Sequence, residues 1–292
     1  MTILIGKDTK VVVQGMTGTA GKAHTRTMLD FGTNIVAGTK PNASNESVYD
    51  IPVFSTVKEA IEKRGANTSI VLVPAQFAKN AALEAINAGI KLVVIAPEHV
   101  PIQDTMEIIE NARKKGCTII GPNTAGVIAP NVKCKVGFVP NRYYTPGSIG
   151  IASRSGTLLY EFGNRLTSEG LGQSTCVGVG GDSIVGTRMA DVVKLFEEDF
   201  ETKATLLIGE VGGTQEEEVA ELVAKGIVRK PIVAYLVGKS APKDKRMGHA
   251  GAIMLQGKET IESKIRILKN ANIEVADTMQ DALKLLRKYV NQ

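Results

Sequence analysis

The sequence predicts an α/β protein made of two consecutive units, each built around a largely parallel sheet. Short runs that are apolar throughout, such as Lys10–Gln14 and Lys91–Ile95, alternate with helical patterns along most of the chain. Strands that are apolar on both faces are typical of parallel sheets covered by helices on both sides. This alternation lapses once, between residues 123 and 148, where prolines and tyrosines occur without clear periodicity. We therefore expect one domain at residues 1–125 and a second at residues 126–292.

In the first unit, β-branched runs predict the strands and the segments between them predict the helices. The expected strands are Lys10–Gln14, Asn34–Gly38, Ile51–Phe54, Ser69–Val73, Lys91–Ile95 and Cys117–Ile120. The expected helices are Gly18–Phe31, Val57–Arg64, Gln76–Ala88 and Pro101–Lys115. This order of elements indicates a Rossmann-like, doubly wound domain.

The second unit repeats the same plan. Its expected strands are Ile149–Ala152, Thr175–Val179, Thr205–Gly209, Ile232–Val237 and Glu274–Ala276. Its expected helices are Gly156–Ser168, Met189–Glu198, Gln215–Ala224, Glu259–Ala271 and Gln280–Val290. The pattern predicts a second open parallel sheet, of flavodoxin-like size.

Composition excludes several classes of protein. The 292 residues are 43% hydrophobic and 22% charged, which is too apolar for a disordered chain and long enough for two domains. The net charge is +5, but lysines and arginines alternate with acids, so no nucleic-acid surface is expected. No apolar run approaches the ~20 residues that cross a membrane.

The cysteines and the N-terminus indicate the compartment. Cys117, Cys134 and Cys176 are odd in number and lack CxxC spacing, so we expect reduced thiols rather than disulfides or metal ligands. The first apolar run is too short for a secretory signal. We expect a cytoplasmic protein, or a mitochondrial matrix protein if a transit peptide has been removed. The histidines are far apart in sequence, so no metal site is predicted.

A glycine-rich turn lies between the first strand and the first helix. Gly15, Gly18 and Gly21 follow a G-x-x-G-x-x-G pattern, which allows a diphosphate to approach the helix N-terminus. A dinucleotide domain would carry an acidic residue after the second strand, but this chain has Lys40 there. A cation suits a ligand with a phosphate on its ribose, such as NADP or coenzyme A. The alternative is a purely structural turn.

The segment Ser153–Thr157 follows a strand and opens a helix. Its hydroxyl groups, together with the N–H groups of a helix start, would form a binding site for an anion. Serine is also common as a helix N-cap whatever the function. The residues alone leave both interpretations open.

Two further residues follow strands of the second unit. Glu210 ends a buried strand, and His249 lies between Gly248 and Ala250 in a loop after the next strand. The small neighbours and the basic residues just upstream indicate a nucleophilic histidine that carries a phosphoryl group. Glu210 would orient its ring, or alternatively cap a helix. His24 and His99 are expected to make local contacts only.

Four segments of the second unit together resemble the α subunit of succinyl-CoA synthetase (succinate–CoA ligase). They are Ser153–Thr157, Gln173–Asp182, Ile208–Gly213 and Lys245–Ala252. The resemblance extends from Ile3 to the C-terminus. It implies an N-terminal CoA-binding domain, a C-terminal ligase domain and a separate β subunit with an ATP-grasp fold. That subunit would bind ATP or GTP with Mg²⁺ in an αβ or α₂β₂ assembly, which fits the lack of a Walker A motif in this chain.

The resemblance also implies a mechanism. The phosphoryl group passes from nucleotide to His249 and then to succinate, and the CoA thiol attacks the acyl phosphate. This yields succinyl-CoA or, in reverse, substrate-level phosphorylation in the tricarboxylic acid cycle. Glu210 matches the glutamate that orients the histidine. The phosphate-binding residues would be Ser153, Ser155, Gly156 and Thr157. The residues expected near CoA are Thr17, Gly18, Thr19, Ala20, Lys40, Ala43, Ala96, Pro97 and Glu98. Those expected near the acid substrate are Tyr160, Asn123 and Thr124.

The chain departs from the family pattern around CoA and the acid. The family often reads T-P-G-K-G-G where this chain has Lys40–Asn45, so the CoA-contacting lysine is replaced by Ala43. The usual G-P-N-C-P-G becomes Gly121–Gly126, with Thr124 in place of cysteine, and Ala96 replaces the middle residue of an I-T-E run. A sister ligase acting on malate or citrate is therefore the alternative. Two alternative hypotheses belong to other functional classes: a CoA-binding regulatory protein and an NADP oxidoreductase.

Overall fold

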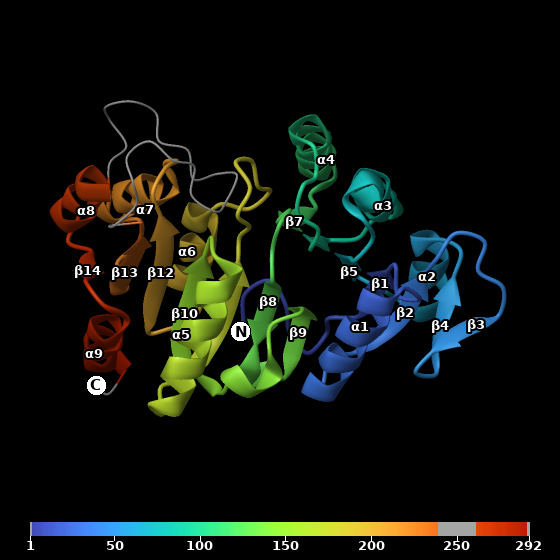
Figure 1. The fold of residues 1–292 in the computed structure, drawn as a ribbon, viewed down its shortest axis with the longest axis horizontal. Helices are drawn as coiled ribbons and strands as arrows, with labels where there is room; N and C mark the ends of the chain where they lie inside the picture. The colour runs from blue at the N-terminus through green and yellow to red at the C-terminus, as the bar shows by residue number, and fades with distance from the viewer. Residues whose placement is uncertain (1, 239–260, 291–292) are drawn as a thin grey trace.

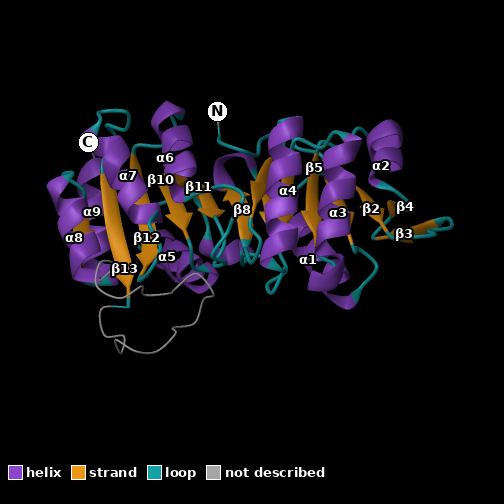
Figure 2. Cartoon of the chain, turned by 90° about the horizontal axis from the view of Figure 1, so that it is seen from above, coloured by secondary structure: helices purple, strands orange, loops and turns teal. Residues whose placement is uncertain are grey.

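The computed structural model describes residues 2–238 and 261–290. Within these residues the chain forms two seven-stranded sheets. Figure 1 shows the two sheets side by side in an elongated molecule, with the first in blue to green and the second in green to red. In Figure 2 the helices flank the strands on both sides. The predicted α/β class is therefore confirmed.

The first sheet has the order β3-β4-β2-β1-β5-β6-β7. All its recorded pairings are parallel except that of β3 with β4. Its strands are β1 Val11–Gln14, β2 Ile35–Thr39, β3 Glu46–Val48, β4 Ile51–Phe54, β5 Thr68–Val71, β6 Leu92–Ile95 and β7 Thr118–Ile120. The helices between them are α1 Thr19–Phe31, α2 Val57–Arg64, α3 Ala75–Ala88 and α4 Ile102–Lys115.

The second sheet has the order β14-β13-β12-β10-β11-β8-β9. Its strands are β8 Gly126–Ala129, β9 Cys134–Gly137, β10 Pro146–Ser153, β11 Gln173–Gly178, β12 Ala204–Glu210, β13 Ile232–Val237 and β14 Glu274–Ala276. The helices are α5 Gly156–Ser168, α6 Met189–Glu198, α7 Gln215–Ala224, α8 Ile261–Asn270 and α9 Met279–Val290. Short 3₁₀ helices at Pro130–Val132 and Asn141–Tyr143 flank β9.

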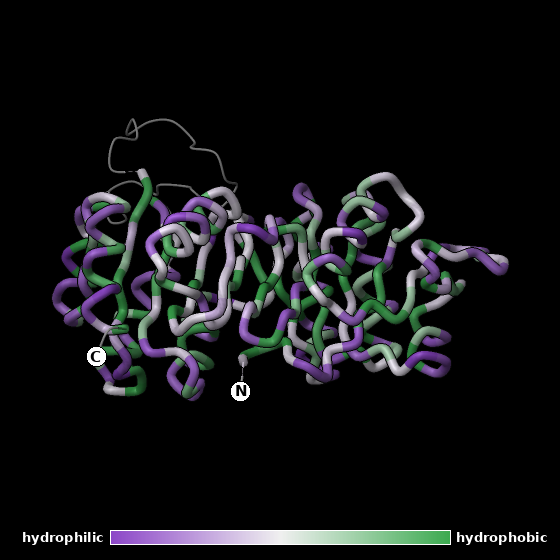
Figure 3. The backbone as a smooth tube through the Cα atoms, turned by 90° about the horizontal axis from the view of Figure 1, so that it is seen from below, coloured by the Kyte–Doolittle hydropathy of each residue, from purple (hydrophilic) through white to green (hydrophobic). Residues whose placement is uncertain are grey.

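Burial explains why the apolar runs form central strands. Every residue of β1, β5, β6 and β12 is buried. A strand that is apolar on both faces removes both sets of side chains from water when helices cover the sheet, and this burial is the main driving force for folding. Figure 3 shows hydrophobic stretches of the backbone mainly in the interior of the molecule and hydrophilic stretches mainly at its outer turns. None of the described helices is long and apolar enough to cross a membrane.

The prediction for residues 123–148 was wrong in one respect. We expected a connection there, but the structure has strands β8 and β9, which pair antiparallel with each other, and β8 also pairs antiparallel with β11. The second sheet is therefore mixed rather than wholly parallel. Strand β8 begins with Gly126 and is followed at once by Pro130, and β9 contains Lys135, so neither is the uninterrupted apolar run by which the other strands were recognised. The short strand β3 was missed for the same reason.

The remaining elements agree with the predictions to within about three residues, the usual uncertainty of element ends. Helices α2, α5, α6 and α7 have the predicted bounds. The change from one sheet to the other falls between Ile120 and Gly126. A domain boundary at residue 125 thus remains our proposal, and it is compatible with this change of sheet.

Candidate active site

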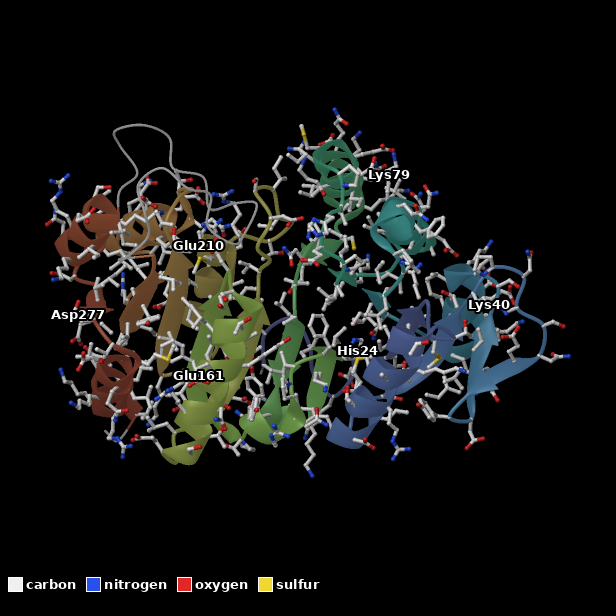
Figure 4. All side chains as sticks on the ribbon, in the orientation of Figure 1. His24, Lys40, Lys79, Glu161, Glu210 and Asp277 are labelled. Carbon is white, nitrogen blue, oxygen red and sulfur yellow. The ribbon has the colours of Figure 1, made fainter. Side chains whose placement is uncertain are left out.

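The carboxyl ends of β10 and β12 form the centre of the candidate site. These strands are parallel neighbours, and Ser153 lies opposite Ile208 in their register. Ser153 is fully buried and Glu210 is 8% exposed. Figure 4 shows Glu210 at the upper end of the second sheet. Ligands of open parallel sheets collect at this edge, because the loops that follow the strands converge there.

Ser155 caps helix α5 and closes a tight turn after β10. The Ser155 Oγ accepts the Leu158 N–H at 3.3 Å, so the N-cap interpretation of this serine is confirmed. The Ser153 Oγ donates to the Ser155 carbonyl at 2.7 Å and accepts the Ser155 N–H at 3.1 Å. The cap and an anion site are compatible, because the first N–H groups of a helix, here those of Gly156 and Thr157, have no partner within the helix.

Arg154 is a residue of this edge that the sequence analysis did not assign to the site. Its side chain is 3% exposed, and its Nη2 lies 2.9 Å from the Glu210 Oε1. Its Nη1 donates to the Gly212 carbonyl at 2.9 Å, and its backbone N–H donates to the Ile208 carbonyl. The signal was its place between two serines at the end of a buried strand, where a charged residue is rarely buried without a functional or structural partner.

Glu210 ends β12 with its carboxylate against a guanidinium group. Its Oε1 lies 2.9 Å from the Arg154 Nη2, across the ends of β12 and β10. Its own backbone N–H donates to the Glu216 Oε1 at 3.0 Å. Glu210 is thus a buried carboxylate held against a guanidinium at the edge where ligands bind. His249 lies outside the described residues.

Asn123 and Thr124 lie between the two sheets. The Asn123 Nδ2 donates to the Asp182 Oδ1 at 3.0 Å, after the end of β11. The Thr124 Oγ1 donates to the Gly178 carbonyl and accepts the Gly126 N–H at 2.9 Å. The Asn123 N–H also donates to the Pro97 carbonyl at 2.8 Å. These bonds join the segment Ala96–Glu98, at the end of β6, to the edge of the second sheet.

The glycine-rich turn borders a cavity of about 520 Å³ at the carboxyl ends of β1, β2 and β5. Gly15 has a φ of +87°, which favours glycine, and a Cβ at Gly21 would lie 2.1 Å from the Gly15 carbonyl oxygen. The turn can therefore approach the helix this closely only with glycines. Residues of the turn and of the next two strand ends line the cavity: Gly15, Thr17, Gly18, Thr39, Lys40, Pro41, Leu72, Val73, Pro74 and Phe77.

Lys40 is placed beside this cavity, and Ala43 is not among the lining residues. The Lys40 Nζ lies 2.8 Å from the Glu46 Oε1, and 43% of the lysine side chain is exposed. The Ala43 N–H donates to the Lys40 carbonyl, which closes the loop after β2. Sequence reasoning missed Val73, Pro74 and the half-exposed Phe77, although their place after a buried parallel strand was a usable signal.

The other predicted residues lie at the rim or elsewhere. Tyr160 lies in the second turn of α5, and burial raises the pKa of its phenol to about 12. His99 is exposed beside Glu98, with their Nε2 and Oε1 atoms 3.6 Å apart. The rings of His24 and Phe138 are tilted by 34° with their centroids 5.1 Å apart. His24 on α1 therefore contacts a residue that follows β9, so its contacts are not only local ones.

Two domain families match the chain. Residues 6–99 match the CoA binding domain family and residues 152–279 match the CoA-ligase family. Each match falls on one sheet, and the matched ranges include the glycine-rich turn in the first case and Ser153, Glu210 and His249 in the second.

The chain is also similar in sequence to named proteins over nearly its whole length. It is 46% identical over 290 residues to the α subunit 1 of ADP-forming succinate–CoA ligase from Archaeoglobus fulgidus, and the match covers 99% of both chains. It is 49% identical over 279 residues to the α subunit of the ADP-forming succinate–CoA ligase from Aquifex aeolicus, covering 95% of this chain and 91% of that one.

Among solved structures, a mutant ATP citrate lyase from Methanosaeta concilii in complex with (3S)-citryl-CoA superimposes with a TM-score of 0.89 at 25% identity. The match covers 99% of this chain and 50% of that one, so this chain spans half of the lyase chain. Both kinds of likeness confirm the resemblance inferred from the four motifs. The chain belongs to the succinate–CoA ligase α-subunit family.

Proposed function

We propose that this chain is the α subunit of an ADP- or GDP-forming succinate–CoA ligase that carries a phosphoryl group on His249 during turnover. The observation that carries the proposal is the meeting of the Arg154–Glu210 pair with the N-terminus of α5 at one sheet edge. A carboxylate there can fix the tautomer of a histidine and support positive charge on it. The helix start can stabilise the phosphate that a phosphohistidine presents.

We propose that the described residues have distinct tasks in the reaction. Gly156 and Thr157 would donate their backbone N–H groups to the phosphoryl oxygens. Glu210, held by Arg154, would accept the other ring N–H of His249. The imidazole would then attack the terminal phosphorus of the nucleotide, and the bond to the leaving diphosphate would break. Transfer of the phosphoryl group to a succinate carboxylate would regenerate the free imidazole.

Coenzyme A would occupy the cavity on the first sheet and supply the thiol that displaces phosphate from the acyl phosphate. The residues there fit such a ligand, because the cavity ends at a helix N-terminus and Lys40 offers a cation for phosphate. The Asn123–Pro97 bond joins the segment that follows β6, on the first sheet, to the segment that leads into the second sheet. Lys40 would replace the lysine that the family has at the position of Ala43.

The proposal requires a partner. The family resemblance implies a β subunit of ATP-grasp fold that binds ATP or GTP with Mg²⁺, and this partner fits the lack of a Walker A motif in the sequence of this chain. The relatives are named as α subunits, which supports a partner without fixing an αβ or α₂β₂ assembly. We expect the complex to act in the cytoplasm.

The test is acyl-CoA formation by the complex of this chain with its β subunit. We expect succinate to be used in preference to malate and citrate, and His249→Ala to abolish turnover while CoA binding persists. Loss of CoA binding in that variant would show that the two sites are not separate. Faster turnover with malate or citrate would replace succinate by that acid and leave the ligase assignment intact.

A further inference from the structure

Two buried charged residues have no task in the proposed reaction. Lys264, in the first turns of α8, and Glu216, in the first turn of α7, both have side chains that are 0% exposed. The Lys264 Nζ donates to the Glu216 Oε2 at 2.7 Å, to the Glu217 Oε2 at 2.8 Å and to the Gly213 carbonyl at 2.7 Å. Each of its three N–H groups therefore has an acceptor.

The second oxygen of Glu216 reaches the proposed catalytic residues. Its Oε1 accepts the backbone N–H of Glu210 at 3.0 Å and lies 4.0 Å from the Arg154 Nη1. Gly209 leaves room for this approach, since a Cβ there would lie 2.4 Å from the Glu216 Oε1. One carboxylate thus connects Lys264 to both members of the Arg154–Glu210 pair.

Charge balance explains why this chain of contacts needs Lys264. The cations Arg154 and Lys264 face the buried carboxylates of Glu210 and Glu216, and the carboxylate of Glu217 is 21% exposed. A buried charge is costly unless it is paired, and removing one partner leaves the other uncompensated. Without Lys264, the carboxylate of Glu216 would have no cation of its own and would compete with Glu210 for the Arg154 guanidinium. Arg154 would then no longer hold the Glu210 carboxylate in one position.

We propose that Glu216 and Lys264 are positioning residues for phosphoryl transfer. Lys264 neutralises Glu216, Glu216 holds the main chain of Glu210 and faces Arg154, and Arg154 directs the Glu210 carboxylate. The inference rests on the proposed function, because it gives Glu210 a part in the chemistry. It goes beyond that function by assigning a role to residues on α7 and α8 that touch no substrate.

The first test is Lys264→Met in the complex with the β subunit. The rate of protein labelling by γ-labelled ATP and kcat should both fall by about 10- to 100-fold, the range typical of residues that hold a functional group in place. The KM for CoA should not change, because the CoA cavity lies on the other sheet. A labelling rate equal to that of the wild type would overturn the proposal.

The second test restores the charge balance. Glu216→Gln combined with Lys264→Met removes one charge of each sign and keeps an amide oxygen for the Glu210 N–H. We expect the double variant to label faster than Lys264→Met and to be more soluble if the single variant folds poorly. A purely structural role predicts that the two losses add, so a double variant slower than the single one would also overturn the proposal.

Two matched variants control for loss of a lysine in general. Lys225→Met breaks the exposed pair with Glu221 at the other end of α7, where the Nζ and Oε1 atoms are 2.6 Å apart. Lys135→Met removes another lysine that is 0% exposed, on β9. Both variants should be labelled by γ-labelled ATP at the wild-type rate. A loss in either equal to that of Lys264→Met would assign the effect to lysine removal rather than to position.

Glu210→Gln separates failure of this inference from failure of the proposed function. If Glu210→Gln is labelled by γ-labelled ATP at the wild-type rate, the role proposed for Glu210 is wrong. If Glu210→Gln is labelled slowly and Lys264→Met at the wild-type rate, the proposed function stands and the positioning role is wrong.

Discussion

Gly21→Ala tests whether the glycine-rich turn approaches helix α1 closely, because the close approach determines whether the substitution raises or lowers stability. Gly21 is the third residue of α1, and inside a helix alanine is ordinarily more stabilising than glycine by about 0.5–1 kcal/mol. Here the new Cβ would lie 2.1 Å from the Gly15 carbonyl oxygen and 2.9 Å from the Met16 carbonyl carbon. These are backbone atoms of the glycine-rich turn, so the clash cannot be relieved by a side-chain rotation.

The expected result is a net loss of stability. Overpacking costs up to about 3 kcal/mol, and the helix preference for alanine offsets about 1 kcal/mol of it. A net loss of about 2 kcal/mol corresponds to a melting temperature lower by roughly 4–8 °C. Thermal unfolding followed by circular dichroism measures the shift, and calorimetry should show weaker CoA binding because the turn is displaced.

Gly18→Ala is the matched control for this prediction. Gly18 is the N-cap of the same helix, and its Cβ would lie 3.5 Å from the Gly15 carbonyl oxygen, which is ordinary contact. We expect its stability to change by less than about 1 kcal/mol. A higher melting temperature for Gly21→Ala than for the wild type would refute the close approach of turn and helix.

Three further predictions follow from buried titratable groups. Burial lowers the pKa of Lys135 to about 8 from 10.5, so the unfolded chain binds more protons between these pH values. The free energy of unfolding of the wild type relative to that of Lys135→Met, measured with urea, should therefore rise from pH 8 to 10.5. A difference between the two proteins that does not change with pH would contradict this prediction. Burial, and secondarily the charge of Lys135, lowers the pKa of His24 below 6.5. Acidification below pH 6.5 should thus destabilise the wild type more than His24→Gln. Equal losses of stability in the two proteins would show that protonation of His24 is not the cause. Burial raises the pKa of the Cys117 and Cys134 thiols to about 11, so a thiol reagent at pH 8 should modify them only after unfolding. Rapid modification of the folded protein would show that they are accessible.

The sequence predicted the central elements well because local patterns determine them. Buried parallel strands are apolar throughout, and the helices between them have recognisable ends, so α5 and β13 were placed with their correct bounds. The same patterns predicted that Ser153 and Glu210 lie at the carboxyl ends of strands in one sheet. The strands β8 and β9 could not be found in this way, because Gly126 begins β8 and Lys135 lies within β9, and both strands gain their stability from pairing along the second sheet.

The contacts that complete the site could not be predicted because they join distant parts of the sequence. Lys264 and Glu216 are 48 residues apart in the sequence. Lysine and glutamate are also common on exposed helix surfaces, so nothing local indicates that these two are buried and paired. Arg154 was visible in a motif, but only the fold shows that its guanidinium meets Glu210 from the neighbouring strand. The Asn123–Pro97 bond joins the two sheets and leaves no local pattern in the chain.

Identification of the phosphorylated residue tests the central claim most directly. The complex with the β subunit would be incubated with γ-labelled ATP, and the label would then be chased with succinate and CoA. The account predicts an acid-labile, alkali-stable label that is lost in His249→Ala, retained in His24→Ala and His99→Ala, and discharged as inorganic phosphate only when both substrates are added. Undiminished labelling of His249→Ala, or a label that both substrates together fail to discharge, would contradict it.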